Sequence, residues 1–193
     1  MRDKIIVVTG ASSGIGREVA KKIGEAGGTV VLVARTREKL EELRDEVEEA
    51  GGTAHVHPAD LSDMDDIDRV ADEIVEQHGR VDILVNNAGR SIRRSVEASY
   101  DRFHDYQRTM QLNYFGAVKL ILKVLPGMRE RKSGHIINVS SIGVQTNTPR
   151  FSAYVASKAA QKKDGADDDG AAKEQEMSTE AVAMAYLLRG VHF

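Results

Sequence analysis

TGASSGIG, residues 9–16, lies between a short apolar run at residues 5–8 and a stretch of helical spacing at residues 17–26. A glycine-rich turn between a strand and a helix lets the backbone approach a pyrophosphate, and the positive end of the helix holds the negative charge. Glycines also build tight turns and flexible connections, so the position of this turn is what favours dinucleotide binding. The loop residues expected to contact the dinucleotide are Gly10, Ser12, Ser13, Gly14, Ile15 and Gly16.

Outward from this loop, short β-branched runs alternate with longer amphipathic stretches. The expected strands are residues 4–9, 29–34, 53–58, 81–86 and 135–140, and a long helical region is expected at about 99–130. This alternation predicts an α/β fold, in which a doubly wound, Rossmann-like parallel sheet lies between two helical layers.

Two of the connecting stretches have apolar residues at helical spacing, which predicts two buried helix faces. Their apolar positions are Leu40, Leu43 and Val47 in the first, and Ile67, Val70, Ile74 and the neighbouring Val75 in the second. Ser62, with Asp65 three residues later, is the expected N-cap of the second helix. Gly51 and Gly79 follow the two helices, where left-handed residues are common.

Composition and charge limit the kinds of partner. A chain of 193 residues predicts one main domain, and a net charge of −3 gives no field that would attract nucleic acid or an anionic membrane. The absence of cysteine excludes disulfides, thiolate metal sites and cysteine nucleophiles, and suits a reducing cytoplasm. No apolar run approaches the roughly 18 residues of a membrane-spanning helix. A small-molecule substrate is therefore the expected partner.

The end of the second expected strand bears on the choice of cofactor. An acidic residue there would hold a ribose 2′-hydroxyl, but this chain has Ala34 and Arg35. A guanidinium can hold a 2′-phosphate through paired, charge-assisted hydrogen bonds, so NADP(H) is favoured over NAD(H). The alternative is that Arg35 points into solvent beside Arg37.

Tyr154 and Lys158 are four residues apart and would share one face of a helix. A nearby ammonium stabilises phenolate, so the pair could exchange a proton at neutral pH. Such a spacing also arises by chance, and other polar groups must accompany it. NVSS, residues 138–141, and NNAG, residues 86–89, supply them where two expected strands end, and Asn113 lies in the long helical region.

With these motifs in order, residues 4–160 resemble the compact branch of the short-chain dehydrogenase/reductase family. The resemblance implies that Tyr154 is the general acid in reduction and that Lys158 holds the nicotinamide ribose and lowers the tyrosine pKa. It implies that Ser141 orients the substrate carbonyl and that Asn113 holds a water in the proton relay. The remaining cofactor contacts that it implies are Asp60 and Leu61 beside the adenine, and Asn87, Ala88 and Gly89 along the cofactor. It also implies a homo-oligomer, either a dimer or a tetramer.

Within the family, residues 90–160 are most similar to the reductase domain of bacterial fatty acyl-CoA reductases. This similarity implies a fatty acyl-CoA or an aldehyde as the carbonyl substrate. Arg90, Arg93 and Arg94 follow the Asn-Gly loop on the expected substrate side, where they could meet a CoA phosphate or an acidic carrier; the alternative is a solvated basic loop. His55 and His57 alternate onto one strand face, but no third ligand accompanies them, and no metal site is expected.

The resemblance ends at Ala160, and we expect the C-terminal strands of the family to be missing. We expect three parts: a catalytic NADP-binding domain at 1–160, an acidic and mobile linker at 161–177, and a short helix at 178–193. A truncated chain, a frame-shifted or engineered tail, and an incomplete listing of residues remain alternative explanations. Two functions therefore stay open. One is an NADP(H)-dependent oxidoreductase, and the other is a nucleotide-binding protein that has lost catalysis.

Overall fold

The computed structural model describes residues 3–163 and 173–174. Six parallel strands form one sheet in the order β3-β2-β1-β4-β5-β6. Their bounds are β1 Ile5–Thr9, β2 Thr29–Ala34, β3 Thr53–Pro58, β4 Ile83–Asn86, β5 His135–Asn138 and β6 Lys173–Glu174. The order reverses between β1 and β4, so a crevice for a ligand is expected at the carboxyl ends of these two strands.

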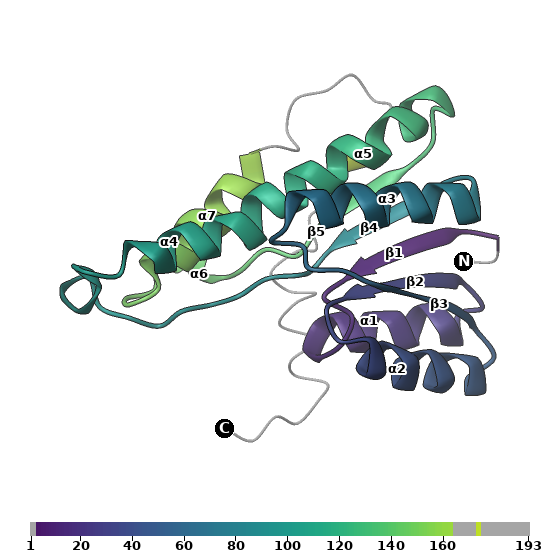
Figure 1. Cartoon of the computed structure of the whole chain (residues 1–193), viewed down its shortest axis with the longest axis horizontal. Coiled ribbons are helices and arrows are strands. Elements are labelled where there is room, and N and C mark those ends of the chain that lie inside the picture. The colour runs from purple at the N-terminus through teal and green to yellow at the C-terminus, as the bar shows by residue number, and fades with distance from the viewer. Residues whose placement is uncertain (1–2, 164–172, 175–193) are drawn as a thin grey trace.

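Helices cover both faces of the sheet, as the sequence predicted (Figure 1). The α-helices are α1 Gly14–Glu25, α2 Arg37–Glu49, α3 Met64–His78, α4 Phe103–Met110, α5 Ala117–Glu130, α6 Gly143–Thr146 and α7 Ser152–Lys163. A short 3₁₀ helix, η1 Glu97–Ser99, precedes α4, and a π-helical segment, η2 Gln111–Gly116, joins α4 to α5. Helices α1 and α2 lie on one face, while α3, α5 and α7 lie on the other.

Two apolar clusters, one on each face, hold the layers together. On the α1/α2 face, Ile6 and Leu32 pack with Leu40 and Leu43 of α2, and all four are buried. On the other face, Val7 and Leu84 pack with residues of α3 and α5. The central strands β1 and β2 are buried on both sides, which explains why their sequences are continuous apolar runs.

Most expected boundaries are confirmed within a few residues, but the start of α3 is corrected. The N-cap is Asp63 rather than Ser62, and the Asp63 carboxylate accepts hydrogen bonds from the N–H groups of Asp65 and Asp66. Ser62 instead bonds backward to Asp60. Gly51 and Gly79 adopt positive φ, as expected after α2 and α3.

The helix faces are also confirmed, with one exception. Leu40, Leu43 and Val47 are buried, as are Ile67, Val70 and Ile74, whereas Val75 is exposed. The expected helical region at 99–130 is divided into α4, η2 and α5. None of the helices in the described part of the chain is long and apolar enough to cross a membrane.

The segment beyond Ala160 differs in part from the expected linker. Helix α7 continues through Lys163, and Lys173–Glu174 pairs with β5 as a sixth strand, so the sheet does extend past β5. The rest of the expected linker and the expected helix at 178–193 lie outside the described residues.

Candidate active site

The glycine loop packs closely against the end of β4, and this close contact leaves no room for a side chain at two of its positions. Gly10 has a φ of +65°, and a Cβ there would lie 2.8 Å from the Cα of Ala88. A Cβ on Gly16 would collide with the Asn87 amide and the Gly10 carbonyl. The loop between β1 and α1 therefore packs directly on the end of β4, and glycine is required for that close approach.

Hydrogen bonds fix the same contact between the ends of β1 and β4. The Thr9 hydroxyl donates to Val85 O (3.2 Å) and accepts from the N–H groups of Asn87 (2.9 Å) and Ala88 (3.0 Å). The Asn87 amide donates to Thr9 O at 2.9 Å. Thr9 is buried, and sequence reasoning treated it only as the last strand residue.

A cleft of about 350 Å³ opens at this edge. Its lining brings together most of the residues expected to hold a dinucleotide: Gly10, Ser12, Ser13, Ile15, Arg35, Asp60, Leu61, Asn87, Ala88 and Gly89. Four further lining residues were not expected: Ala34, Thr36, Ala59 and Leu112. Ala34, Thr36 and Ala59 neighbour residues expected to contact the cofactor, whereas Leu112 comes from η2, next to the expected catalytic Asn113.

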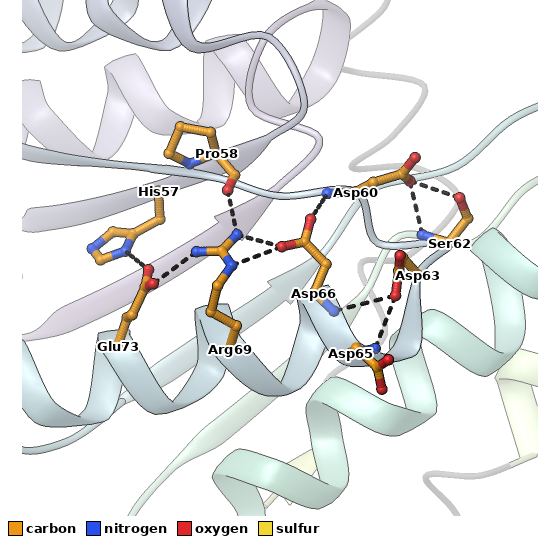
Figure 2. A network of polar contacts seen from close by, with 9 residues as sticks. All are labelled: His57, Pro58, Asp60, Ser62, Asp63, Asp65, Asp66, Arg69 and Glu73. Carbon is orange, nitrogen blue, oxygen red and sulfur yellow. Dashed lines mark hydrogen bonds and ion pairs between the residues drawn. The ribbon is translucent and has the colours of Figure 1, made fainter.

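The loop after β3 is held in the cleft by the first turns of α3 (Figure 2). Asp66 accepts a hydrogen bond from the N–H of Asp60 (2.6 Å), and Arg69 bridges Asp66, Glu73 and the Pro58 carbonyl. Asp60 and Leu61 are thus positioned by side chains of the helix that follows them.

Arg35 and Asp60 both line the cleft, and the charge of Arg35 acts on the Asp60 carboxylate. Burial alone would raise the pKa of Asp60, but hydrogen bonds from Ser62 and the charge of Arg35 outweigh it and lower that pKa. Asp60 is therefore ionised at neutral pH. Its negative charge lies near the cation that was expected to hold a 2′-phosphate.

Lys158 is buried beside the end of β5. Its Nζ donates to Val139 O (2.9 Å) and to Gln161 Oε1 (2.9 Å). Burial lowers the pKa of Lys158 to about 8. A Cβ on Gly89 would lie 3.7 Å from this Nζ, so the ammonium reaches the lining of the cleft.

Tyr154 lies one turn before Lys158 on α7, as the expected helix requires. Its ring makes an edge contact with Phe151, with 6.4 Å between the ring centroids. Ser141 follows the end of β5 and accepts a hydrogen bond from the N–H of Gly143 at 3.2 Å, which begins the short helix α6. Both residues therefore come from elements at the carboxyl edge of the sheet.

Asn113 lies inside the π-helical segment and is fully buried. Its side chain accepts from the N–H of Arg90 (2.8 Å) and donates to the Arg90 carbonyl (3.0 Å) and to the Ser157 hydroxyl (2.9 Å). Asn113 thus joins the loop after β4 to α7. Its side chain is occupied by these contacts, and the expected role in holding a water stays a prediction.

The three arginines after the Asn-Gly loop are not equivalent. Arg90 and Arg93 are exposed, whereas Arg94 forms an ion pair with the buried carboxylate of Asp105 at 3.1 Å. The Arg94 N–H also donates to Arg150 O at 2.7 Å. Arg94 therefore anchors its loop to α4, and only Arg90 and Arg93 of this trio present an exposed charge.

Three histidines gather between β3 and α3. The rings of His55 and His57 lie 4.6 and 6.0 Å from that of His78, measured between centroids. Among residues 3–163 and 173–174, no group of three or more histidine, cysteine or acidic side chains is arranged to hold a metal ion. Burial first, and then the charges of His55 and His57, lowers the pKa of His78 to about 4.

The family model for short chain dehydrogenases matches residues 4–163, which is most of the sequence. The chain belongs to the short chain dehydrogenase family. A crystal structure of a metagenomic short-chain oxidoreductase in complex with NADP superposes with a TM-score of 0.86 and 33% identity, covering 91% of this chain and 81% of that one. The parallel sheet with flanking helices is thus the fold of the family.

One curated relative of this chain carries only a general name, and another is named for its substrate. An uncharacterized oxidoreductase of Mycobacterium tuberculosis is 66% identical over 163 residues, which is 83% of this chain and 48% of that protein. A fatty acyl-CoA reductase of Acinetobacter baylyi is 59% identical over 160 residues, which is 83% of this chain and 54% of that protein. This chain spans about half the length of these relatives.

Proposed function

We propose that this protein is an NADP(H)-dependent oxidoreductase that reduces a carbonyl substrate, with a fatty acyl-CoA or a fatty aldehyde as the substrate class. The observation that carries the proposal is the cleft at the strand-order reversal, which the glycine loop lines and whose lining the buried Lys158 ammonium reaches beside Gly89. Hydride transfer is proposed from the membership of the family, and the role of each site residue is proposed from its chemistry and position.

A dinucleotide with a phosphorylated ribose would lie in this cleft. The loop residues 10–16 and the first turn of α1 would hold the pyrophosphate, since Ser13 leaves the helix end without a side-chain cap. Arg35 would pair with the 2′-phosphate, while Asp60 and Leu61 would flank the adenine. When bound, the cofactor supplies a hydride to the carbonyl carbon.

The protein's own groups would handle the charge that develops on the substrate oxygen. Ser141 would donate a hydrogen bond to this oxygen, and the Tyr154 hydroxyl would give it a proton. The Lys158 ammonium, one turn later on α7, would stabilise the resulting phenolate and hold the nicotinamide ribose. Asn113 would support this arrangement by joining α7 to the loop after β4.

Two observations support an acyl-CoA as the substrate class. A relative named as a fatty acyl-CoA reductase is 59% identical over 83% of this chain. Arg90 and Arg93 are exposed after the Asn-Gly loop, where a CoA phosphate could meet them. On the same family grounds we propose a homo-oligomer, and the absence of cysteine supports a cytoplasmic location.

The test is turnover of the purified chain with NADPH and either a fatty acyl-CoA, a fatty aldehyde or a small uncharged ketone. We expect Tyr154→Phe to lower turnover at least about 100-fold because the proton donor is lost, while NADPH affinity measured by fluorescence stays within about twofold. Arg93→Glu should raise the apparent KM for the acyl-CoA and not for the ketone. Turnover retained in Tyr154→Phe would refute the proton-donor role.

The second candidate is a nucleotide-binding protein without catalysis. It would rest on the same cleft and glycine loop, which could hold a nucleotide without any hydride transfer. It predicts NADPH binding with no turnover of any of the three substrates. Failure to bind either NADPH or NADH would contradict both candidates.

A further inference from the structure

Gln161 is a buried polar residue three positions after Lys158 on α7, and only 3% of its surface is exposed. The sequence placed it at the start of a linker, with no role in the site. A buried amide must find hydrogen-bond partners, because an unsatisfied one would cost stability. The partners of Gln161 lead directly to the proposed catalytic lysine.

A chain of side-chain hydrogen bonds connects the ends of β4 and β5 to Lys158. The Asn86 amide donates to Asn138 Oδ1 at 3.0 Å, and the Gln161 amide donates to the same oxygen at 3.4 Å. Gln161 Oε1 then accepts from Lys158 Nζ at 2.9 Å. The four residues Asn86, Asn138, Lys158 and Gln161 are all buried.

These contacts use two of the three donors of the lysine. An ammonium has three N–H groups. One goes to Val139 O and one to Gln161 Oε1, so their fixed acceptors also fix the direction of the third. The Nζ faces Gly89, which lines the cleft.

We propose that Gln161 is a positioning residue that holds the Lys158 ammonium in place at the cleft before any ligand binds. This inference rests on the proposed function, since Lys158 is the group expected to hold the nicotinamide ribose and to act on Tyr154. Gln161 itself need not touch substrate or cofactor. Its contribution is to use one N–H of the lysine and so direct the remaining one.

The hydrogen bond has a measurable consequence for the charge of Lys158. An acceptor bonded to the ammonium favours the charged form and opposes the effect of burial. The neighbouring groups at this Nζ, namely Val139 O and Gly89, are uncharged, as is the Asn113 amide that lies beside Gly89. Tyr154 is the titratable group one turn away on α7. Removing the Gln161 acceptor should therefore make the lysine lose its proton at lower pH.

The experiment is an NMR pH titration of the Lys158 Nζ in the full chain without ligand, with ¹⁵N-labelled lysine. Lys158→Met identifies the signal. We expect the midpoint to fall by about one pH unit in Gln161→Met, which keeps the unbranched shape without the acceptor. It should rise in Gln161→Glu, which adds a charge to the acceptor. Gln77→Leu, at an exposed glutamine of α3, is the matched control and should leave the midpoint unchanged.

A merely structural role would give a different result. It would lower the stability of Gln161→Met to urea while the Nζ midpoint stays the same in all variants, and that outcome would overturn the proposal. If Gln161→Met does not fold, the rise expected in Gln161→Glu decides the question alone. The titration needs no turnover, so a shifted midpoint in a protein that reduces no substrate would refute the proposed function and leave the role of Gln161 intact.

Discussion

The two halves of the sheet are held together in different ways. In the half formed by β1, β2 and β3, apolar side chains fill the interior, and Ile6 and Leu32 are fully buried on the α1/α2 face. On that same face, Ile83 of β4 and Ile137 of β5 are only partly buried. The second half also buries apolar residues such as Leu84, but it adds a hydrogen-bonded group of buried polar side chains on and after β4 and β5.

The contrast follows from what each half must do. Apolar packing is strong but non-directional, and it suits a loop that binds through its backbone. An ammonium must be placed to within a fraction of an ångström, and directional hydrogen bonds can do this. The half that would perform proton transfer therefore adds buried polar contacts to its apolar packing.

The most direct way to break the comparison is a pair of identical substitutions on one face of the sheet. Ile6→Ala in β1 should lower the free energy of unfolding by about 3–4 kcal/mol, since it leaves a cavity in a closed core. Ile137→Ala in β5 should cost about 1–2 kcal/mol, because the site is already partly open. Urea unfolding of both variants measures the difference. Equal losses would show that Ile137 is covered as completely as Ile6.

The cofactor preference tests the cleft residue Arg35, which directly follows β2 in the first half of the sheet. Arg35→Asp should change the ratio of NADPH to NADH affinity by about 100-fold, because a carboxylate repels the 2′-phosphate and accepts from a 2′-hydroxyl. The new charge would also lie near Asp60, whose pKa Arg35 now helps to lower. Fluorescence titration with both cofactors measures the ratio. The same preference in wild type and variant would mean that Arg35 does not read the phosphate.

A smaller effect concerns the histidines between β3 and α3. Burial keeps His57 and His78 neutral in the folded protein, and the pKa of His78 is lowered to about 4 from 6.5. Between pH 6.5 and pH 4 the unfolded chain therefore binds more protons at His78 than the folded protein does. The contribution of neutral His78 to the free energy of unfolding is fully present above about pH 6.5 and is lost as the pH falls toward 4.

The loss attributable to His78 between pH 7 and pH 5 should be about 1 kcal/mol, after allowance for its partial exposure. The control is His78→Gln, because the difference between it and wild type separates His78 from carboxylates such as Asp66, whose lowered pKa acts in the same direction at lower pH. Urea unfolding at the two pH values measures it. A wild type that loses no more stability than His78→Gln would contradict the assignment.

Much of this organisation could be predicted from the sequence because it depends on local pattern. The bounds of β2 follow directly from a β-branched run, those of β3 agree with the prediction, and Gly51 and Gly79 follow their helices as expected. The spacing of Tyr154 and Lys158 correctly predicts a shared helix. The site roles of these residues remain predictions that the experiments above address.

Other features depend on contacts between distant segments and could not be predicted. Ser62 and Asp63 are both residue types that cap helices well. The Ser62 hydroxyl donates to the Asp60 carboxylate instead, and Asp63 is the N-cap. The different roles of Arg93 and Arg94 could not be predicted, because they depend on the ion pair between Arg94 and Asp105 of α4. Gln161 stood in a polar stretch that indicated a linker, but α7 turns its amide toward Asn138.

The position of β1 at the centre of the sheet also has a consequence for synthesis. Ile6 pairs with Val30 on one side and with Ile83 on the other. One edge of this strand therefore has no partner strand until more than 70 further residues have been synthesised. At roughly 5–20 residues per second, the ribosome needs several seconds to deliver β4. During that interval the nascent chain presents an unpaired, strongly apolar strand edge, which is the kind of surface that chaperones shield.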